Sequence, residues 1–491
     1  MEKLRKALQH FLEPITRNMI GLIGVIVTTV MGVVTLFLSL LQFAGVFENP
    51  YAGVIIFAAL PPVFIGGLLL IALGYYIDHR EKVKGGQLPH KWPVFDFNKP
   101  ENRIRTIFIV TLTVVNALIV GLGASGGMNY MNSPKFCGQV CHTVMSPEYT
   151  AFQNSPHSKV RCVDCHVGGG LEWWVKSKIS GLRQVIGVMT GSYAKPVPSP
   201  VHNLRPAQGT CEECHWPDKF IGDRRRIFTK HNNDEESTPN YSVLYLKVGG
   251  QKGGPDGKYE GIHWHVNKNA KVEFKALDDR RAKIGWVKVT KKDGKVVEYF
   301  TEEYTKTANK ETLEAKEMDC LDCHNRPTHE FYLPEKALNL ALSDGRLDRK
   351  LPFLYRESLR VLKKEYAEEQ IDVEIPKQIK AYYSKEHPEI AKQEVELINK
   401  TADQLVKIYR RNNWPKMELR WGFHKSHIGH NDVPGCGRCH NADMLTKDGK
   451  GLSDVEGDCE NCHDVLVEEE EDLCAVKKVL HPGSEPEECE E

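Results

Sequence analysis

The pentapeptide Cys162-Val-Asp-Cys-His166 determines what kind of protein this sequence can form, because its C-x-x-C-H pattern recurs along the chain. Further strict copies occupy 211–215, 320–324, 436–440 and 459–463, and a copy with one extra residue between its cysteines occupies 137–142. C-x-x-C-H is the attachment signature of c-type haem, in which two thiols bond to the haem vinyl groups and the adjacent imidazole reaches the iron. The sequence therefore predicts six covalently attached haem c groups.

These motifs use twelve of the fourteen cysteines. The cysteines predicted to bond haem are Cys137, Cys141, Cys162, Cys165, Cys211, Cys214, Cys320, Cys323, Cys436, Cys439, Cys459 and Cys462, and the motif histidines are His142, His166, His215, His324, His440 and His463. Zinc knuckles and a thioredoxin-like redox pair are the alternatives, but neither requires histidine directly after each second cysteine. The remaining cysteines, Cys474 and Cys489, can pair with each other in an oxidising compartment.

The first quarter of the chain contains three long stretches without charged residues, 18–47, 49–77 and 106–134. Each exceeds the roughly 20 residues that cross a bilayer as a helix. We therefore expect transmembrane helices near 19–43, 52–77 and 104–127, with a kink or break in the second at Pro61-Pro62. A cleaved signal peptide is the alternative for the first stretch, which is too long and lacks a convincing small-residue cleavage site.

Lysine and arginine are concentrated in residues 1–18 and in the loop 78–103, and they are absent between the first two apolar stretches. The positive-inside rule places both basic segments in the cytoplasm and everything after the third helix outside. Haem is attached to such motifs on the outer face of the bacterial cytoplasmic membrane, which agrees with this orientation. The sequence predicts a multi-pass inner-membrane protein with a periplasmic haem region.

The expected fold is a membrane-anchored multihaem cytochrome c. Its periplasmic region is expected to be mainly α-helical and irregular, packed around haem, with a β-rich insert. The expected segments are haem sites 1–3 (128–215), the insert (216–318), haem site 4 (319–331), a helical segment (332–420), haem sites 5–6 (421–466) and an acidic tail (467–491). Alternating apolar residues predict strands at 241–248 and 284–290, and a turn at 292–295 leads into a further strand at 296–300. An acidic run is usually a solvated tail, and steering of a basic electron carrier is the alternative.

A low-spin haem needs a second axial ligand, for which neutral imidazole is well suited. The candidate distal ligands are His157, His202, His263, His265, His329, His424, His427 and His430. His157, His329 and one or two of the last three are favoured, whereas His231, His387 and His481 are expected to be bystanders. His263 and His265 alternate, so on a strand they would share one face. At the first site Met145 follows His142 by three residues and is a candidate thioether ligand.

Residues 104–215 and 318–331 resemble the NapC/NirT family of membrane-anchored tetrahaem quinol dehydrogenases. The resemblance rests on the helix that runs into Phe136-Cys137, the methionine after the first motif, Ser155-Pro-His157, and Cys320-Leu-Asp-Cys-His-Asn-Arg-Pro-Thr-His329. The segment 427–440 is also similar to the larger NapC/NirT-type cytochromes of metal-reducing bacteria. The two additional N-terminal helices, the insert and the C-terminal haem pair are departures from the tetrahaem pattern.

The resemblance implies a first haem near the membrane with methionine on its iron, a position that Met145 would fill. It also implies an adjacent quinol pocket with a lysine and an acidic group. Lys176 and Lys178 are the candidate lysines, and Gln184 stands where the acid is expected. Lysines beside Trp173-Trp174 at a membrane surface also commonly bind headgroups, which is the alternative role.

The leading hypothesis is a menaquinol dehydrogenase that takes electrons from the membrane quinone pool and passes them through six haems. The acceptor would be a periplasmic c-type cytochrome or a reductase. Two alternatives remain: a terminal multihaem reductase of a small nitrogen or sulfur substrate, and a passive electron-transfer subunit fed by another quinol-oxidising subunit. A homo-oligomer is left open, and no nucleic-acid partner is expected.

Overall fold

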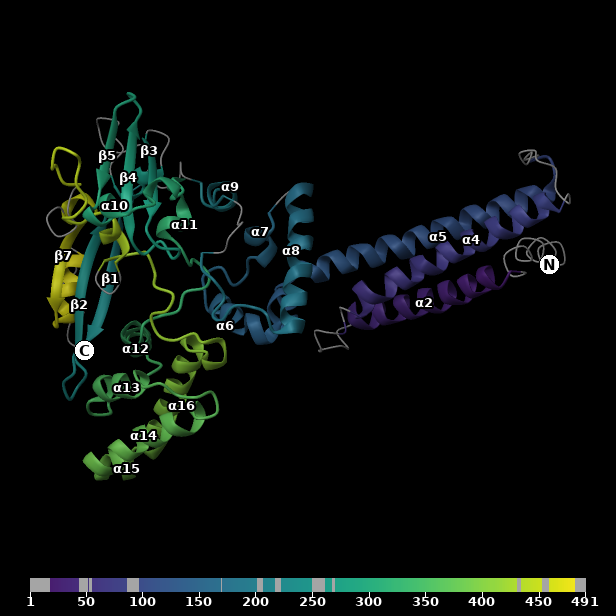
Figure 1. The fold of residues 1–491 in the computed structure, drawn as a ribbon. Helices are drawn as coiled ribbons and strands as arrows, with labels where there is room; N and C mark the ends of the chain where they lie inside the picture. The colour runs from purple at the N-terminus through teal and green to yellow at the C-terminus, as the bar shows by residue number, and fades with distance from the viewer. Residues whose placement is uncertain are drawn as a thin grey trace. The chain divides into compact units, whose positions relative to one another are not determined.

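The computed structural model describes residues 18–43, 52, 55–85, 97–168, 170–200, 206–216, 222–249, 261–266, 270–430, 434–452 and 459–481. The chain divides into two compact units, Met1–Met145 and Ser146–Glu491, each with its own internal packing. The first unit contains the apolar helices and the first cysteine motif. The second contains the other five motifs, two small sheets and a helical body (Figure 1).

Within the described residues of the first unit, three helical segments are long and apolar enough to span a membrane, as the sequence predicts. They are α2 (Met19–Phe43), the π-helical turn η1 (Ile55–Ala59) continuing into α4 (Leu60–Lys84), and α5 (Pro100–Met131). Pro61 and Pro62 occupy the first turn of α4, where the missing backbone N–H of proline is tolerated. The helix therefore changes from π to α geometry at the site where the sequence predicts a break.

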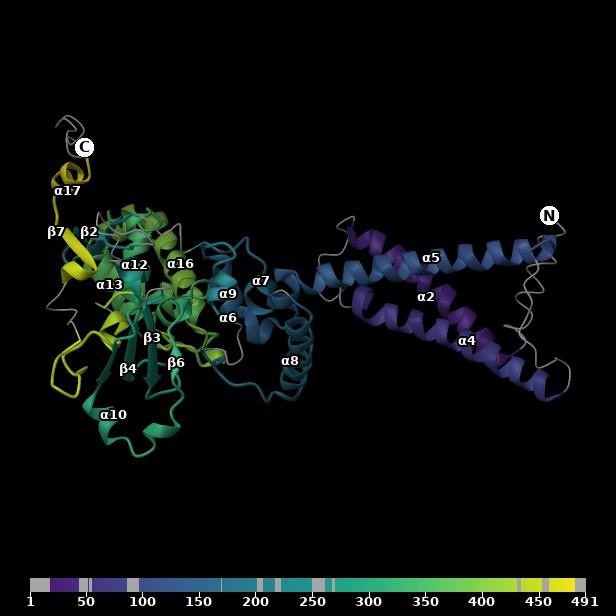
Figure 2. The ribbon, with the colours of Figure 1, turned by 90° about the horizontal axis from the view of Figure 1, so that it is seen from above.

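Helices α2 and α4 pack side by side through glycine (Figures 1 and 2). A Cβ atom added to Gly67 would lie 2.5 Å from Thr28 Oγ1 and 2.9 Å from the Thr28 backbone nitrogen. One added to Gly24 would lie 2.7 Å from the backbone nitrogen of Ile71. Small residues at such positions let transmembrane helices approach closely, which maximises van der Waals contact.

The first cysteine motif lies directly after α5, in the π-helical turn η2 (Phe136–Val140), and is followed by α6 (His142–Gln153). A π-helix has a wider turn than an α-helix because its hydrogen bonds span five residues. The extra residue between Cys137 and Cys141 is accommodated in this wider turn. Phe136 packs edge-to-face on Tyr130 at the end of α5, with ring centroids 5.5 Å apart.

In the second unit the cysteine motifs lie on short helical turns. These are α7 (Cys162–His166), α9 (Gln208–Cys211), α11 (Cys320–Cys323), η7 (Gly435–Arg438) and η8 (Cys459–Asn461), with the longer helix α8 (Leu171–Thr190) after the second motif. At the fourth motif, Asp319 and Asp322 form a reciprocal capping box that stabilises the start of α11.

The second unit contains two antiparallel sheets, as expected for the β-rich insert. One has the order β1-β2-β7, formed by β1 (Arg224–His231), β2 (Pro239–Leu246) and β7 (His463–Glu470). The other has the order β5-β4-β3-β6, formed by β3 (Ala270–Ala276), β4 (Ile284–Lys291), β5 (Val296–Phe300) and β6 (Lys316–Glu317), and three of these lie side by side in Figure 2. The predicted hairpin turn joins β4 to β5, with Gly294 at φ 82°.

The segment after the last motif is partly folded, unlike the solvated tail that its acidity indicates. It forms β7, which pairs with β2, and then α17 (Leu473–Leu480), whose Val476 is fully buried. The pairing with β2 supplies the backbone hydrogen bonds, and apolar Val465 and Val467 are interspersed among the acidic residues. Cys474 in α17 is disulfide-bonded, and Cys489 lies outside the described residues.

The helical segment forms a compact body whose core contains fully buried Leu354, Ile375, Tyr383 and Leu405. Its helices are α12 (Pro334–Ser343), α13 (Leu354–Leu362), α14 (Ile371–Glu386), α15 (Pro388–Gln393) and α16 (Val395–Asn412). Short elements elsewhere in the unit are η4 (Ile262–Val266), α10 (Glu302–Lys306), η5 (Lys310–Thr312) and η6 (Pro415–Met417).

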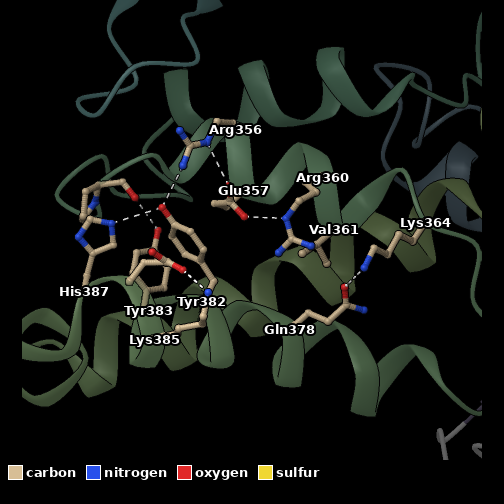
Figure 3. Close-up of polar contacts among 12 residues, drawn as sticks. Arg356, Glu357, Arg360, Val361, Lys364, Gln378, Tyr382, Tyr383, Lys385 and His387 are labelled. Carbon is tan, nitrogen blue, oxygen red and sulfur yellow. Dashed lines mark hydrogen bonds and ion pairs between the residues drawn. The ribbon is translucent and has the colours of Figure 1, made fainter.

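Figure 3 shows how α13 is joined to α14 through polar side chains. The buried carboxylate of Glu357 accepts hydrogen bonds from Arg356 and Arg360, at 3.1 and 2.7 Å. Arg356 also donates to the hydroxyl of Tyr382 on α14, which lies 3.3 Å from His387 Nε2. His387 is thus part of the helix packing, in line with its expected bystander role.

Candidate haem centres

In the second unit each of the five motif histidines faces a second histidine. The pairs and their ring-centroid distances are His166–His329 at 6.1 Å, His215–His157 at 5.9 Å, His324–His263 at 6.4 Å, His440–His265 at 5.7 Å and His463–His430 at 6.2 Å. Each pair joins residues far apart in the sequence or on different elements. Similar ring-centroid distances recur in all five pairs, which indicates that the pairs have the same role.

The spacing fits an iron ion between two imidazoles. Metal–imidazole nitrogen bonds of about 2 Å on opposite sides of an ion leave roughly 4 Å between the nitrogens and about 6 Å between the ring centroids. The two Nε2 atoms of His265 and His440 face each other directly at 3.5 Å. The paired residues therefore fit bis-histidine haem beside cysteines that can form the thioethers.

Burial keeps most of these imidazoles in the neutral form that binds metal. Desolvation lowers the pKa of His166, His329, His263, His265 and His324 below the ordinary value. Neutral imidazole has a free lone pair on one ring nitrogen, whereas the protonated form has none. These five side chains are thus favoured in the chemical state that ligation requires.

His329 is oriented by the segment after the first motif. Its Nδ1 donates to the backbone carbonyl of Glu148 at 2.9 Å, which leaves Nε2 for the iron. The Glu148 carboxylate lies 3.3 Å from the same Nδ1 and accepts two bonds from Arg326 Nη2, at 2.7 and 2.9 Å. Glu148 and Arg326 were not candidates from the sequence, because 178 residues separate them and no local pattern links them.

One turn supplies two of the paired histidines. His263 and His265 lie on the 3₁₀-helix η4, so the expectation that they share one strand face is wrong. Residues two apart on a 3₁₀-helix point in different directions, and the two rings face His324 and His440 respectively. Their Nδ1 atoms donate to the carbonyls of Val248 and Ile262, at 3.1 and 2.8 Å.

The other candidate histidines do not face a motif histidine or lie outside the described residues. His427 Nδ1 donates to the Asp322 carbonyl, and burial with nearby Arg438 lowers its pKa to about 4. His424 stacks on Phe331, and burial lowers its pKa to about 3. His202 falls in 201–205, outside the described residues. His231, an expected bystander, hydrogen-bonds Asn339.

Neighbouring motifs contact one another in sequence order. Cys165 of the second motif interacts electrostatically with Cys214 of the third, Cys211 of the third hydrogen-bonds Cys320 of the fourth, and Cys323 of the fourth interacts electrostatically with Cys436 and Cys439 of the fifth. Arg438, inside the fifth motif, donates to the Asp322 carbonyl inside the fourth at 2.6 Å. The second to fifth sites therefore form a continuous series.

The sixth motif joins this series through Lys247. The Lys247 N–H donates to the Cys462 carbonyl, and its own carbonyl accepts from Ile262 at the start of η4, both at 2.8 Å. The turn that carries His263 and His265 is thus one residue away from a contact with the last motif. Within the described ranges, no group of three or more His, Cys, Asp or Glu side chains is arranged to bind a metal ion.

A model of the NapC/NirT cytochrome c family, N-terminal region, matches residues 99–198. The cytochrome c-type protein ImcH of Geobacter sulfurreducens is 37% identical over 486 residues, which cover 98% of this chain and 94% of that protein. The chain belongs to the NapC/NirT cytochrome c family. No solved structure matches it.

Membership of the NapC/NirT family makes the chain a multihaem c-type cytochrome with membrane helices. It implies covalently bound haem c, quinol-linked electron transfer, and quinone and periplasmic redox partners in general. The family match begins at the start of α5 and ends beyond α8. It therefore covers the first two motifs and the helix that carries the candidate quinol-site residues.

The NapC/NirT match includes the first motif, which belongs to the first unit. The half-buried Met145 donates its backbone N–H to the Cys141 carbonyl at 3.0 Å, in the first turn of α6. The backbone of His142 begins the same helix, and its side chain is outside what the structure describes. The choice between these two iron ligands stays a prediction.

The candidate quinol-site residues lie along α8 but on different sides of it. Lys176 forms an ion pair with Glu172 at 2.6 Å and lies 4.7 Å above the Trp173 ring centre. Lys178, two residues on, points to another side of the helix. Gln184 is exposed and hydrogen-bonds Ser180 at 3.3 Å. Glu172 was not a candidate from the sequence, and its carboxylate lies beside Lys176.

Proposed function

We propose that this chain is a membrane-bound menaquinol dehydrogenase that passes electrons through six haem c groups to a periplasmic cytochrome or reductase. The observation that carries the proposal is the set of five facing histidine pairs, at 5.7–6.4 Å, beside five cysteine motifs. Haem c with two axial ligands supplies one-electron transfer and leaves no open position for a substrate. Such sites suit conduction of electrons from one end of the protein to the other.

Each haem would be held by the two cysteines and the histidine of one motif. The distal ligands that the geometry supports are His329 for the second site, His157 for the third, His263 for the fourth, His265 for the fifth and His430 for the sixth. Met145 is proposed for the first site, from the family resemblance. The contacts between successive motifs support the path from the second site to the fifth, and Lys247 links the sixth.

The quinol end is proposed to lie at α8, with Lys176, Lys178 and Gln184 as the candidate residues for binding the quinol oxygens. Because they lie on different sides of the helix, one quinol would contact only some of them. Quinol oxidation releases two protons, so a nearby proton acceptor is needed. Gln184 cannot accept a proton, and the Glu172 carboxylate, ion-paired with Lys176 Nζ, is the acceptor at hand. The basic segments 1–18 and 78–103 support an orientation with the N-terminus in the cytoplasm and the haem region in the periplasm.

A terminal reductase is less well supported, because it needs a haem with an open distal side. The five described pairs occupy that side in each case. A passive electron-transfer subunit fits the same geometry as the dehydrogenase, and only its source of electrons differs. The two are therefore separated by experiment and not by the fold.

The test uses the full chain in lipid nanodiscs, with haem content measured by the pyridine haemochrome. We expect six haems per chain and rapid haem reduction by a menaquinol analogue with no other subunit present. Reduction that requires an added partner subunit would establish the passive subunit instead. Rapid reoxidation of the reduced protein by nitrite or hydroxylamine alone would establish the reductase.

A further inference from the structure

We propose that α8 lies in the membrane–water interface, with one apolar face against the boundary between lipid headgroups and acyl chains. This adds a second kind of membrane contact to the spanning helices. It does not depend on whether the chain oxidises a quinol.

The first observation is an apolar stripe that faces outward. Along α8 the exposed fractions are 42% for Val175, 67% for Ile179, 64% for Leu182, 54% for Ile186 and 82% for Met189. These residues follow one another at steps of four, three, four and three, so they form a single stripe along the helix. Five large apolar side chains in one exposed stripe mark an interaction surface, whereas scattered single ones do not.

The second observation is that half-buried residues of α8 lie on the side opposite the stripe, where Ser180 and Gln184 are exposed. Trp173, Ser177, Gly181 and Val188 on that side are half-buried, although two of them are small or polar. A helix on the surface of a water-soluble protein shows the reverse arrangement, with its apolar stripe toward the core. The orientation of α8 is therefore suited to an apolar environment outside the protein.

The third observation is the placement of charge, which selects a lipid surface over an apolar protein partner. Lys178 borders the stripe on one side, and Lys176 and Arg183 border it on the other. Glu172 is the acidic residue of the helix, so its charge is 3 − 1 = +2. Basic side chains beside an apolar stripe reach toward headgroups while their stems cover apolar surface, and anionic phospholipid favours them.

The fourth observation is continuity with the membrane helices. The helix α5 ends at Met131 and α8 begins at Leu171, so a short connection that includes the first two motifs tethers α8 to a membrane-spanning segment. Tethering raises the local concentration of lipid surface around α8. A moderate affinity for the interface is then sufficient to keep the helix there.

The experiment uses the full chain with p-benzoylphenylalanine, a photoreactive residue, in nanodiscs of phosphatidylethanolamine and phosphatidylglycerol. The test variants are Ile179→p-benzoylphenylalanine and Leu182→p-benzoylphenylalanine, and the matched control is Ser180→p-benzoylphenylalanine on the other side of the helix. After irradiation, mass spectrometry of the α8 peptide identifies what each position contacts. All three positions are exposed, so each variant is expected to fold.

We expect phospholipid adducts at Ile179 and Leu182, with at least tenfold less at Ser180. Adducts between Ile179 and residues 18–131 of the same chain, or a second copy, would overturn the proposal by showing a protein partner. Equal lipid labelling at all three positions, or none at Ile179 and Leu182, would also overturn it. Absence of menaquinol oxidation by the unsubstituted chain, with lipid labelling of the variants intact, would count against the proposed function alone.

Discussion

Glu148 connects the proposed second haem site to the segment after the first motif. Its carbonyl accepts from His329, and its carboxylate is bound by Arg326, whose side chain is 7% exposed. Outer-shell groups of this kind fix the orientation of a ligating imidazole and increase its basicity. The carboxylate also offsets the buried charge of Arg326, which would otherwise lie uncompensated beside the proposed distal ligand.

At the residue scale we predict that Glu148→Gln raises the reduction potential of the haem proposed between His166 and His329. Loss of the carboxylate leaves Arg326 uncompensated, and added positive charge favours the reduced iron by an amount on the order of tens of millivolts. A spectroelectrochemical titration of the full protein measures the shift. Glu389→Gln on exposed α15 is the control, and a titration identical to that of the unsubstituted protein would exclude this role.

The residues proposed to bind iron show what the sequence could predict at this scale. Each motif histidine is adjacent to its cysteines, so its role follows from a local pattern. The distal partners depend on tertiary folding: His157 precedes the second motif but faces His215 of the third, and His329 follows the fourth motif but faces His166 of the second. Residue type and position in the chain give a set of candidate histidines. The fold shows which of them faces which motif histidine.

At the scale of elements, long apolar runs and strict alternation were the reliable signals. The helix α2 begins and ends where expected, and β4 and β5 form the predicted hairpin. The strand β1 was missed because its sequence, Arg-Arg-Arg-Ile-Phe-Thr-Lys-His, has no apolar alternation, and it is held by pairing with β2. The strand β7 was missed for the same reason, since tertiary pairing outweighs the local preference of an acidic segment.

The packing of α2 on α4 leads to a prediction with a neighbouring control. Gly67→Ala is expected to destabilise the membrane unit by about 1–3 kcal/mol, because its Cβ would meet the Thr28 backbone nitrogen at 2.9 Å. Gly66→Ala is the control, since no heavy atom lies within 4 Å of its Cβ position. The temperature at which half of the detergent-solubilised protein loses monodispersity measures the effect. Equal values for the two variants would contradict the close contact between these helices.

At the scale of the whole second unit, the β-rich insert and the C-terminal pair of cysteine motifs fold as one structure. The strand β7 directly follows the sixth motif and joins the edge of one sheet at β2. Leu445, after the fifth motif, pairs with Phe300 at the edge of the other sheet. The insert also supplies His263 and His265 to the fourth and fifth sites. The two additions to the tetrahaem pattern are therefore parts of a single extension, which meets the family-like sites at the turn η4.

This arrangement predicts that one glycine controls two haem sites. Gly261 precedes η4 at φ 101°, and an added Cβ would lie 2.4 Å from the Lys247 carbonyl oxygen. Gly261→Ala is thus expected to displace the turn and withdraw both of its histidines, giving high-spin signal from two haems per chain. His263→Ala and His265→Ala are each expected to affect one.

The measurement is electron paramagnetic resonance of the oxidised full-length protein, with spin counts referred to total haem. The control is Gly294→Ala, which also has positive φ, at 82°, but has no heavy atom within 4 Å of the added Cβ. It also places a side chain at positive φ but without the collision, so its haems should stay low-spin. If Gly261→Ala changed one haem, the glycine would not control both sites. If His263→Ala changed two haems, the two histidines would not serve separate irons. The extension would then be joined to the family-like sites by some contact other than η4.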